Sequence, residues 1–485
     1  MFAEYEDHDA VGLAGLVAQK AVSAEELLDA ALARVGALNP LLNAVTLVQE
    51  ETARRSIRAG LPSGPFAGVP FLLKDLGAEA VDFPTHLGSR LHRDTRYDYD
   101  SEIYLRLRDS GLVTFGRTTV PEGAIGAATE AVVYGGPTRN PWSLDHTPGG
   151  SSGGAAAAVA AGIVPAAHGS DGGGSVRIPA SSCGLFGFKA TRARLPDGPA
   201  SGEAWGGMAI DGFLTRSVRD TAVLLDACEG PDLGAPYFPP PLGAGYRDAI
   251  SRPPDRLRIA LCDTTLTGAP LHPEARAAVH DAARLLADLG HHVEPALPRA
   301  DTPAMMEAWT RIVACGTALS VRQTVAARGH ALEPEEVEGV SRGAMAFAAT
   351  LTGEDYLEAL ETVHAYGRQM ARFFLDWDIL LTPTLAEPPA RIGRFSHATE
   401  DYVGYRTGPD GIFAYSPFTV SFNASGQPAA SVPLYWTPEG LPVGVQLAAA
   451  FGEDERLISL CAELETARPW FNRRPPVTLA GIARR

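Results

Sequence analysis

Residues 149–183 read GGSSGGAAAAVAAGIVPAAHGSDGGGSVRIPASSC, two glycine loops on either side of an alanine-rich segment. The first loop brings Ser151 and Ser152 to the start of a helix expected at residues 155–161, where free backbone N–H groups and the helix dipole favour negative charge. The second loop places three glycines directly before Ser175. Consecutive glycines let several N–H groups converge on one point, as an oxyanion hole requires. An anion site and a plain tight turn are the simpler interpretations of such loops.

Apolar runs of strand length lie on the amino-terminal side of these loops. Residues 68–73 form one such run, with Lys74 at its carboxyl end, and residues 112–116 form another. An amphipathic helix is predicted at residues 99–110, between the two runs. Alternation of this kind indicates an α/β fold.

The carboxyl-terminal half repeats the alternation. Residues 257–262, a helix at 273–289 and a strand after Gly290 predict a βαβ unit. Residues 302–377 have a helical pattern. Further strands are expected at 379–383 and 441–447, and a last helix at 453–467.

Composition excludes several classes of partner. The 485 residues carry a formal net charge of −16, which repels nucleic acid and anionic membrane surfaces. The longest apolar stretch, residues 155–167, is broken by Gly162 and Pro165 and is too short to span a bilayer. The acidic amino terminus does not resemble a signal peptide, and the five cysteines lack the spacing of a disulfide framework or zinc site. We therefore expect a cytoplasmic protein without metal or cofactor.

One lysine stands out as a candidate base. The chain has only three lysines, Lys20, Lys74 and Lys189, and Lys74 follows an apolar strand. Burial can lower the pKa of a lysine amine far enough for it to accept a proton near pH 7. His168 lies too near in sequence to be an ordinary triad partner for these serines. We infer that Lys74 takes a proton from Ser175 through a relay serine of the first loop.

The first loop also contains a motif that would give a different nucleophile. Residues 149–153 satisfy G-x-S-x-G, the nucleophile elbow of α/β-hydrolases, which would make Ser151 the nucleophile. That elbow follows a buried strand, whereas residues 140–148 contain two prolines and several polar groups. The S-x-x-K, Walker A, H-E-x-x-H and G-x-G-x-x-G motifs are absent.

These segments together resemble the amidase signature hydrolases over nearly the whole chain. The matching segments are 72–75, 149–154, 171–179 and Cys183-Gly184. The resemblance implies one domain over residues 1–485, a mixed twisted β-sheet with helices on both faces. Residues 231–377 would form a variable, largely helical layer over the pocket.

The resemblance also implies a role for each site residue. Ser175 is the nucleophile, Ser151 a bridging serine on a cis peptide bond, and Lys74 the general base. The oxyanion hole is made by the N–H groups of Gly172, Gly173, Gly174 and Ser175. Supporting roles fall to Asp171, Arg177 and Ser152, although Ser152 is equally well interpreted as a helix cap.

Within the family, residues 65–70, 138–142 and 422–428 are most similar to the 6-aminohexanoate-cyclic-dimer hydrolases. The resemblance places Cys315 in the substrate pocket, although a small buried cysteine on a helix is the simpler interpretation. Trp205 and Met208, among the glycines of residues 203–213, are the other pocket candidates.

The expected function is hydrolysis of amide C–N bonds through an acyl-enzyme, on linear or cyclic oligoamides, anilides or carbamates. The partner is a small-molecule substrate, and the protein is expected to be a monomer or homodimer. Two alternatives stay open: an amidotransferase A-type subunit that delivers ammonia to a partner, and a non-catalytic protein that binds an anion.

Overall fold

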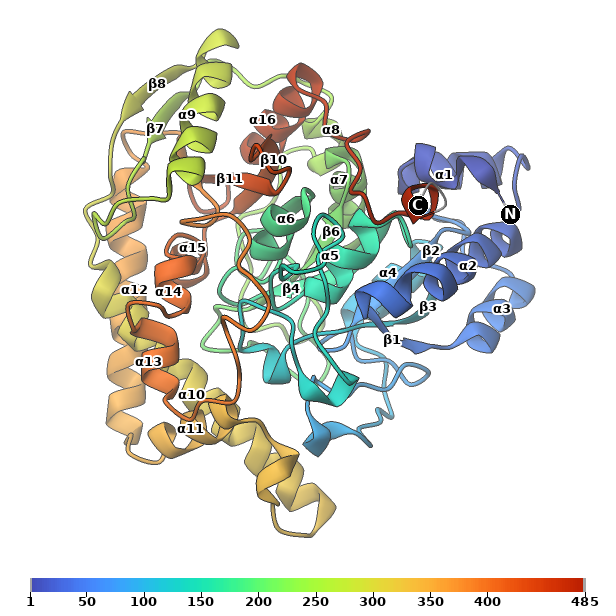
Figure 1. Cartoon of the computed structure of the whole chain (residues 1–485). Helices are drawn as coiled ribbons and strands as arrows, with labels where there is room; N and C mark the ends of the chain where they lie inside the picture. Colours follow the sequence, from blue (N-terminus) through green and yellow to red (C-terminus); the bar gives the residue numbers. More distant parts are fainter. Residues whose placement is uncertain (1, 483–485) are drawn as a thin grey trace.

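A single mixed β-sheet runs through the computed structural model, which describes residues 2–482 (Figure 1). Its eleven strands lie in the order β1-β3-β2-β4-β6-β5-β10-β11-β9-β7-β8. The strands are β1 (Val45–Val48), β2 (Pro70–Lys74), β3 (Val113–Thr118), β4 (Ala166–Asp171), β5 (Phe186–Lys189), β6 (Ile210–Thr215), β7 (Arg258–Leu261), β8 (His292–Pro295), β9 (Ile379–Pro383), β10 (Ala429–Trp436) and β11 (Pro442–Ala449).

Helices pack on both faces of this sheet. Helices α5 and α6 contact each other and the central strands. Helices α7 and α16 contact each other, and α7, α9 and α16 each pack against strands of the same part of the sheet. The helices are α1 (Ala10–Ala18), α2 (Ala24–Leu42), α3 (Glu50–Ala59), α4 (Glu102–Asp109), α5 (Gly153–Ala160), α6 (Arg177–Cys183), α7 (Val218–Cys228), α8 (Tyr246–Ala249), α9 (Pro273–Asp288), α10 (Thr302–Arg328), α11 (Gly339–Ala348), α12 (Gly353–Phe373), α13 (Tyr402–Thr407), α14 (Ile412–Tyr415), α15 (Thr419–Ser425), α16 (Asp454–Ala467) and α17 (Leu479–Ile482). The predicted α/β fold with a mixed sheet is confirmed.

Strand direction brings two polar ends to one edge of the sheet. Strand β2 is parallel to β3 and to β4, with Leu72 opposite Ala167. The carboxyl ends of β2 and β4 therefore lie side by side, which puts Lys74 next to the segment that follows Ala167. Beyond β4, the pairs β4–β6, β6–β5, β5–β10, β10–β11 and β11–β9 are antiparallel.

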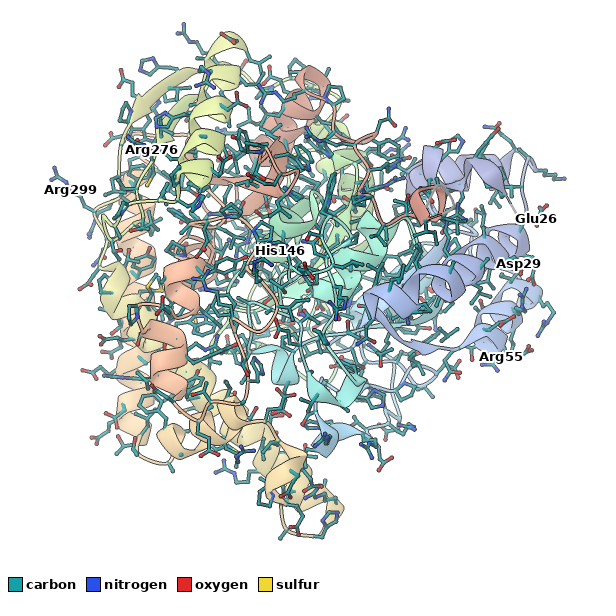
Figure 2. All side chains as sticks on the ribbon, viewed as in Figure 1. Glu26, Asp29, Arg55, His146, Arg276 and Arg299 are labelled. Carbon is teal, nitrogen blue, oxygen red and sulfur yellow. The ribbon has the colours of Figure 1, made fainter. Side chains whose placement is uncertain are left out.

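Amphipathic helices cover the amino-terminal end of the sheet. Ser23 closes a capping box with Glu26 at the start of α2, and the helix ends at Asn43 in the left-handed conformation. Its buried side chains are mostly leucine and alanine. Charged side chains such as Asp29 on α2 and Arg55 on α3 point outward (Figure 2). None of the described helices has the length and apolar character needed to cross a membrane.

Helix α5 is buried on every side. All eight of its residues are buried, so it has no polar face, and its many glycines and alanines let it lie close to β2, β3, β4 and β6. An added Cβ at Gly154 would stand 2.4 Å from the backbone nitrogen of Thr119. This close packing fixes the loop before α5, which carries Ser151 and Ser152.

Residues 231–377 contribute to both the sheet and the outer layer. The predicted βαβ unit is β7-α9-β8, and its two parallel strands form one edge of the sheet. Helix α10 then packs on both α11 and α12, and residues of α10 and α11 reach the site (Figure 1).

Candidate active site

Lys74 ends strand β2 with its side chain fully buried. Its Nζ lies 2.7 Å from Ser151 Oγ and 2.9 Å from Ser170 Oγ. Burial lowers the pKa of the amine to about 7, although Asp211 and Asp171 oppose the shift. A neutral amine has one lone pair and two N–H groups, so Lys74 can accept the Ser151 proton while donating to Ser170.

The first glycine loop holds Ser151 beside this amine. The peptide bond between Gly150 and Ser151 is cis, as the family resemblance implied. Ser152 precedes α5 without capping it: its hydroxyl donates to the Ser170 carbonyl and accepts from the Ser170 N–H, each at 3.3 Å. The side chain of Ser152 therefore ties the first loop to β4, which excludes the helix-cap alternative.

The second glycine loop is held by one buried ion pair. Arg177 donates to Asp171 through Nε at 2.9 Å and Nη2 at 2.8 Å, and both side chains are inaccessible. Asn423 adds a bond from Nδ2 to Asp171 Oδ1 at 2.9 Å. Burial alone would raise the pKa of Asp171, but the charge of Arg177 and these hydrogen bonds hold it well below its usual range. These bonds therefore fix the start of the second glycine loop at Asp171.

The amides of this loop differ from the prediction at one position. The N–H of Gly174 donates to Asp171 Oδ1 at 2.7 Å, so it is not free to bind an oxyanion. In the described part of the chain, the N–H groups of Gly172, Gly173 and Ser175 have no acceptor. These three amides are the available donors, and Gly174 instead anchors the loop.

Two side chains orient the peptide groups of the loop. Trp309 Nε1 donates to the Gly172 carbonyl at 3.0 Å, and Thr419 Oγ1 donates to the Gly173 carbonyl at 2.6 Å. An added Cβ at Gly172 would lie 2.6 Å from the ring of Trp205. Glycine is therefore needed at Gly172 because an indole lies directly against the backbone.

Ser175 stands on the turn between this loop and α6. Its carbonyl accepts the N–H of Ser152 at 3.2 Å, which links the two glycine loops. Its side chain is partly exposed and, with Ser151, lines a cavity of about 220 Å³. The hydroxyl of Ser175 is thus accessible to a small molecule.

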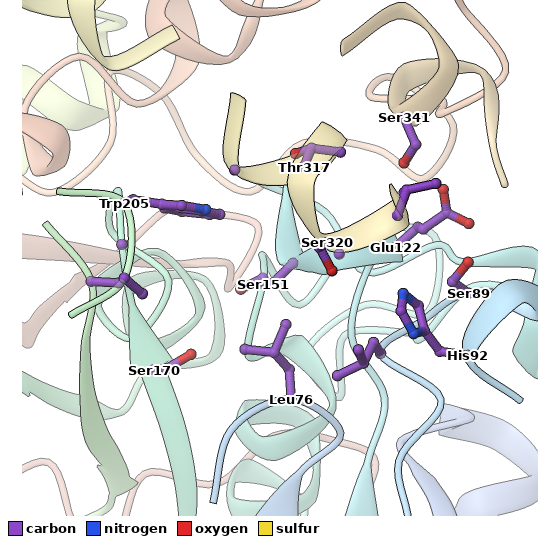
Figure 3. A pocket seen from close by; sticks show the side chains of 18 of the residues that line it. Leu76, Ser89, His92, Glu122, Ser151, Ser170, Trp205, Thr317, Ser320 and Ser341 are labelled. Carbon is purple, nitrogen blue, oxygen red and sulfur yellow. The ribbon is translucent and has the colours of Figure 1, made fainter. Parts of the chain in front are cut away.

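The cavity has different chemistry at its two ends (Figure 3). Trp205 and Ser170 lie at one side of the view, and Glu122, Ser89, His92 and Ser341 at the other. The remaining wall is mixed, with apolar and small polar side chains. Its other lining residues are Leu76, Leu87, Gly123, Ala124, Gly172, Ala204, Ala209, Gly316, Thr317, Ser320, Val321 and Val337.

The predicted pocket residues are only partly in this wall. Trp205 lines the cavity, but Cys315 and Met208 do not. On α10, Gly316, Thr317 and Ser320 face the cavity, and the helical rotation of about 100° per residue turns Cys315 away. Met208 is 2% exposed and packs in the apolar cluster that contains Trp309.

The sequence alone did not predict three residues of the wall or loop: Ser170, Trp309 and Glu122. Ser170 lies one residue before Asp171 at the end of β4, and the pairing of β2 with β4 would have placed it near Lys74. Trp309 lies more than 130 residues from the loop it orients, and no local signal marks it. Glu122 follows Thr-Val-Pro in a loop with no periodic pattern.

His168 contacts Lys74 only through the backbone. Its Nδ1 accepts the Lys74 N–H at 3.3 Å, and its Nε2 lies 3.1 Å from Asp211 Oδ1. The ring therefore supports the end of β2 rather than contacting either serine of the site.

Comparisons with known proteins identify the family of the chain. The Amidase family model matches residues 26–458. The chain is 38% identical over 476 residues to 6-aminohexanoate-cyclic-dimer hydrolase of Paenarthrobacter ureafaciens, covering 96% of each protein. It is 37% identical over 485 residues to the putative amidase AmiB2 of Mycobacterium tuberculosis (strain ATCC 25618 / H37Rv), covering 97% of this chain and 98% of the relative.

Solved structures show the same fold. A 6-aminohexanoate cyclic dimer hydrolase complexed with substrate superposes with a TM-score of 0.92 at 36% identity, covering 97% of this chain and 99% of that one. A bacterial aryl acylamidase of the amidase signature family superposes with a TM-score of 0.86 at 30% identity, covering 96% of both. The chain belongs to the amidase signature family and is a hydrolase acting on C–N bonds.

Proposed function

We propose that this hydrolase cleaves amide C–N bonds through an acyl-enzyme on Ser175, with Ser151 as proton relay and Lys74 as general base. The observation that carries the proposal is the 2.7 Å contact between Lys74 Nζ and Ser151 Oγ. The amine is buried and its pKa is lowered to about 7, so it can be neutral near pH 7. A hydroxyl next to a neutral amine can pass a proton in either direction.

Acylation begins when Ser175 Oγ attacks the substrate carbonyl. Its proton moves to Ser151 Oγ as the proton of Ser151 moves to Lys74 Nζ. The tetrahedral intermediate collapses when the C–N bond breaks, and the proton returns from Lys74 through Ser151 to the leaving nitrogen. Water then attacks the ester along the same route and releases the acid, which restores the free serine.

The negative oxygen of the intermediate needs donors on the opposite side from the relay. The N–H groups of Gly172, Gly173 and Ser175 supply them. Asp171 and Arg177 position the loop through their hydrogen bonds and do not line the cavity. Loss of one such donor costs about 10²–10³-fold in kcat in other serine hydrolases, so the preorganisation of this loop is a large part of catalysis.

The substrate class follows from the position of the relay. Because Ser151 must protonate the leaving nitrogen, the leaving part of the substrate occupies the cavity that Ser151 lines. About 220 Å³ accommodates more than ammonia, which favours secondary amides such as anilides and linear or cyclic oligoamides, and also carbamates. The relatives named for cyclic amide and aryl acylamide hydrolysis support this substrate class.

The remaining features of the proposal concern the protein as a whole. We take residues 1–485 as one domain, with residues 231–377 as a variable layer over the cavity, because the strands of that segment join the same sheet. The five cysteines are unpaired, which fits a reducing cytoplasm. The chemistry needs a small-molecule amide or carbamate and no cofactor, and it can run in a monomer or homodimer.

The experiment that tests the proposal is product release from matched substrates. Release of a chromophoric aniline from an acyl anilide and from an aryl carbamate is measured beside ammonia release from the corresponding primary amide, with Ser175→Ala as blank. We expect turnover of the anilide or carbamate to exceed that of the primary amide and to vanish in Ser175→Ala. Turnover by Ser175→Ala, or a preference for the primary amide, would contradict the proposal.

The alternatives predict different results in the same experiment. An amidotransferase subunit would release ammonia from an amide donor and would need an ATP-using partner for its full reaction. An anion-binding protein would turn over none of the three substrates.

A further inference from the structure

The end of the cavity that holds Glu122 is not used by the proposed mechanism. Glu122 begins the short helix η3 (Glu122–Ala124), is 3% exposed and lines the cavity. In Figure 3 it lies with Ser341 and Ser89 on the side opposite Trp205 and Ser170. A carboxyl group thus forms part of the wall that a substrate reaching beyond Ser151 would meet.

Glu122 is hydrogen-bonded but has no cation beside it. Its Oε1 accepts the N–H of Glu338 at 2.8 Å. The side chain of Ser341 lies beside the carboxyl, and the hydroxyl of Ser89 donates to the Glu336 carbonyl at 3.1 Å. No ion pair to Glu122 exists among the described residues. Burial raises its pKa, and the nearby carboxylate of Glu338 adds to the rise.

The other polar groups at this end do not neutralise the carboxyl. Burial and the charge of Arg328 lower the pKa of His92 to about 4, so the imidazole is neutral near pH 7. The remaining polar groups are the hydroxyls of Ser89, Ser320 and Ser341. This end of the cavity therefore holds hydroxyls, a neutral imidazole and one buried carboxyl, and none of its described lining side chains carries a positive charge.

A purely structural role explains only part of this arrangement. Glu122 Oε1 supports the start of α11 by accepting the N–H of Glu338, and a glutamine oxygen at the same place would accept that bond equally well. The acidic group costs free energy when buried without a counter-ion. A cationic or N–H donor group in the cavity would offset this cost.

We propose that Glu122, with the hydroxyls of Ser89 and Ser341, binds an ammonium or N–H group of the substrate at the end of the cavity remote from Trp205. The enzyme then favours amides that carry a second nitrogen, either in the acyl chain or in the leaving amine. This specificity rests on the proposed function, because Ser175 fixes the scissile carbonyl while Glu122 binds a substituent.

The test compares two matched pairs of substrates at about pH 8, where alkylamines are protonated. One pair is an ω-aminoalkanoyl 4-nitroanilide and the alkanoyl 4-nitroanilide of equal chain length. The other is 4-(aminomethyl)acetanilide and 4-ethylacetanilide. The ratio of kcat/KM for the cationic over the neutral member is measured in wild type, Glu122→Gln and Glu130→Gln.

Glu130→Gln is the matched control. Glu130 is a half-buried carboxyl, which accepts the N–H of Gly393 at 3.0 Å, but it does not line the cavity. We expect wild type and Glu130→Gln to prefer the cationic member in at least one pair. In Glu122→Gln that ratio should fall about tenfold, because KM for the cationic member rises while the neutral substrates are little affected.

Equal ratios in wild type and Glu122→Gln for both pairs would overturn the specificity. Failure of the catalytic proposal is a separate result: wild type would not turn over the neutral anilides, or Ser175→Ala would.

A measurement on wild type covers the case in which Glu122→Gln does not fold. Competitive inhibition of neutral-anilide hydrolysis by an n-alkylammonium ion is compared with inhibition by the n-alkanol of equal length. Tighter binding of the ammonium supports the subsite, and equal or weaker binding overturns it.

Discussion

The surroundings of two buried lysines separate a candidate base from a structural residue. Lys74 at the end of β2 and Lys189 at the end of β5 are 0% and 1% exposed, and burial lowers the pKa of each to about 7. Lys74 Nζ lies against the hydroxyls of Ser151 and Ser170, at the cavity. Lys189 Nζ donates to the carbonyl of Ala190 at 2.8 Å, and it lines none of the cavity wall.

Burial and a lowered pKa are therefore not enough to identify a general base. The difference is the chemistry within reach of Nζ: a relay hydroxyl for Lys74, and a carbonyl that can only accept for Lys189. The comparison predicts that the two lysines affect stability in the same way and activity in different ways.

The largest expected effect is on turnover. Lys74→Met should lower kcat for an anilide by about 10³-fold, because it removes the base while keeping an apolar side chain of similar length. Lys189→Met should lower kcat by less than about threefold, since Lys189 contacts neither serine of the site. Steady-state kinetics on both variants, with thermal melting to show that each is folded, tests the difference. Similar losses in both variants would remove the distinction.

The second effect is on the pH dependence of wild type. Lys74 must be neutral to accept a proton, and its pKa is about 7. The acidic limb of kcat/KM should therefore fall about tenfold per pH unit below that value, or about 100-fold at two units below. Lys189→Met should keep the same limb. A profile that stays flat down to pH 5 would contradict the role of Lys74.

The third effect is on stability and is shared by the two lysines. The unfolded chain holds each proton up to the ordinary pKa of 10.5, whereas the folded chain releases it near 7. Unfolding thus takes up protons between these values, and the free energy of unfolding rises with pH over this range. Each methionine variant should flatten that rise by roughly 2 kcal/mol between pH 7.5 and 9.5. Urea unfolding at the two pH values measures it, and an unchanged rise in either variant would contradict this prediction.

The smallest effect concerns Ser170, the second hydroxyl at Lys74. Ser170→Ala removes an Oγ that lies 2.9 Å from Nζ, and one hydrogen bond of this kind contributes about 1 kcal/mol. We expect kcat to fall about fivefold, with KM for a neutral anilide unchanged. Ser181→Ala, at a buried serine on α6 outside the cavity, is the control. A loss in Ser170→Ala as large as that in Lys74→Met would mean that Ser170 is itself the relay.

Local sequence signals predicted the elements that position the site. The apolar run before Lys74 forms β2, and the alanine-rich segment forms α5. Each depends on neighbouring residues alone: strand-length apolarity, and a helix former repeated along one segment. The two glycine loops also come together as expected, through the Ser152–Ser175 backbone bond.

Features that depend on distant contacts were not predicted. Strands β5 and β6 lie among glycines, prolines and serines, and they are stable because β10 and β4 pair with them. Whether a loop amide is free to bind an oxyanion also depends on distant contacts, because the N–H of Gly174 donates to Asp171 only in the folded turn. On α10, one step of helical rotation decided that Gly316 and not Cys315 faces the cavity.

The most direct test of the Lys74–Ser151–Ser175 relay is the rate at which a fluorophosphonate labels the protein, measured against pH in wild type, Lys74→Met and Lys189→Met. Mass spectrometry of the labelled peptide identifies the serine. The relay predicts a single adduct on Ser175, a rate that rises with one ionisation near pH 7, and loss of that rate in Lys74→Met but not in Lys189→Met. An adduct on Ser151, or equal rates in the two lysine variants, would contradict it.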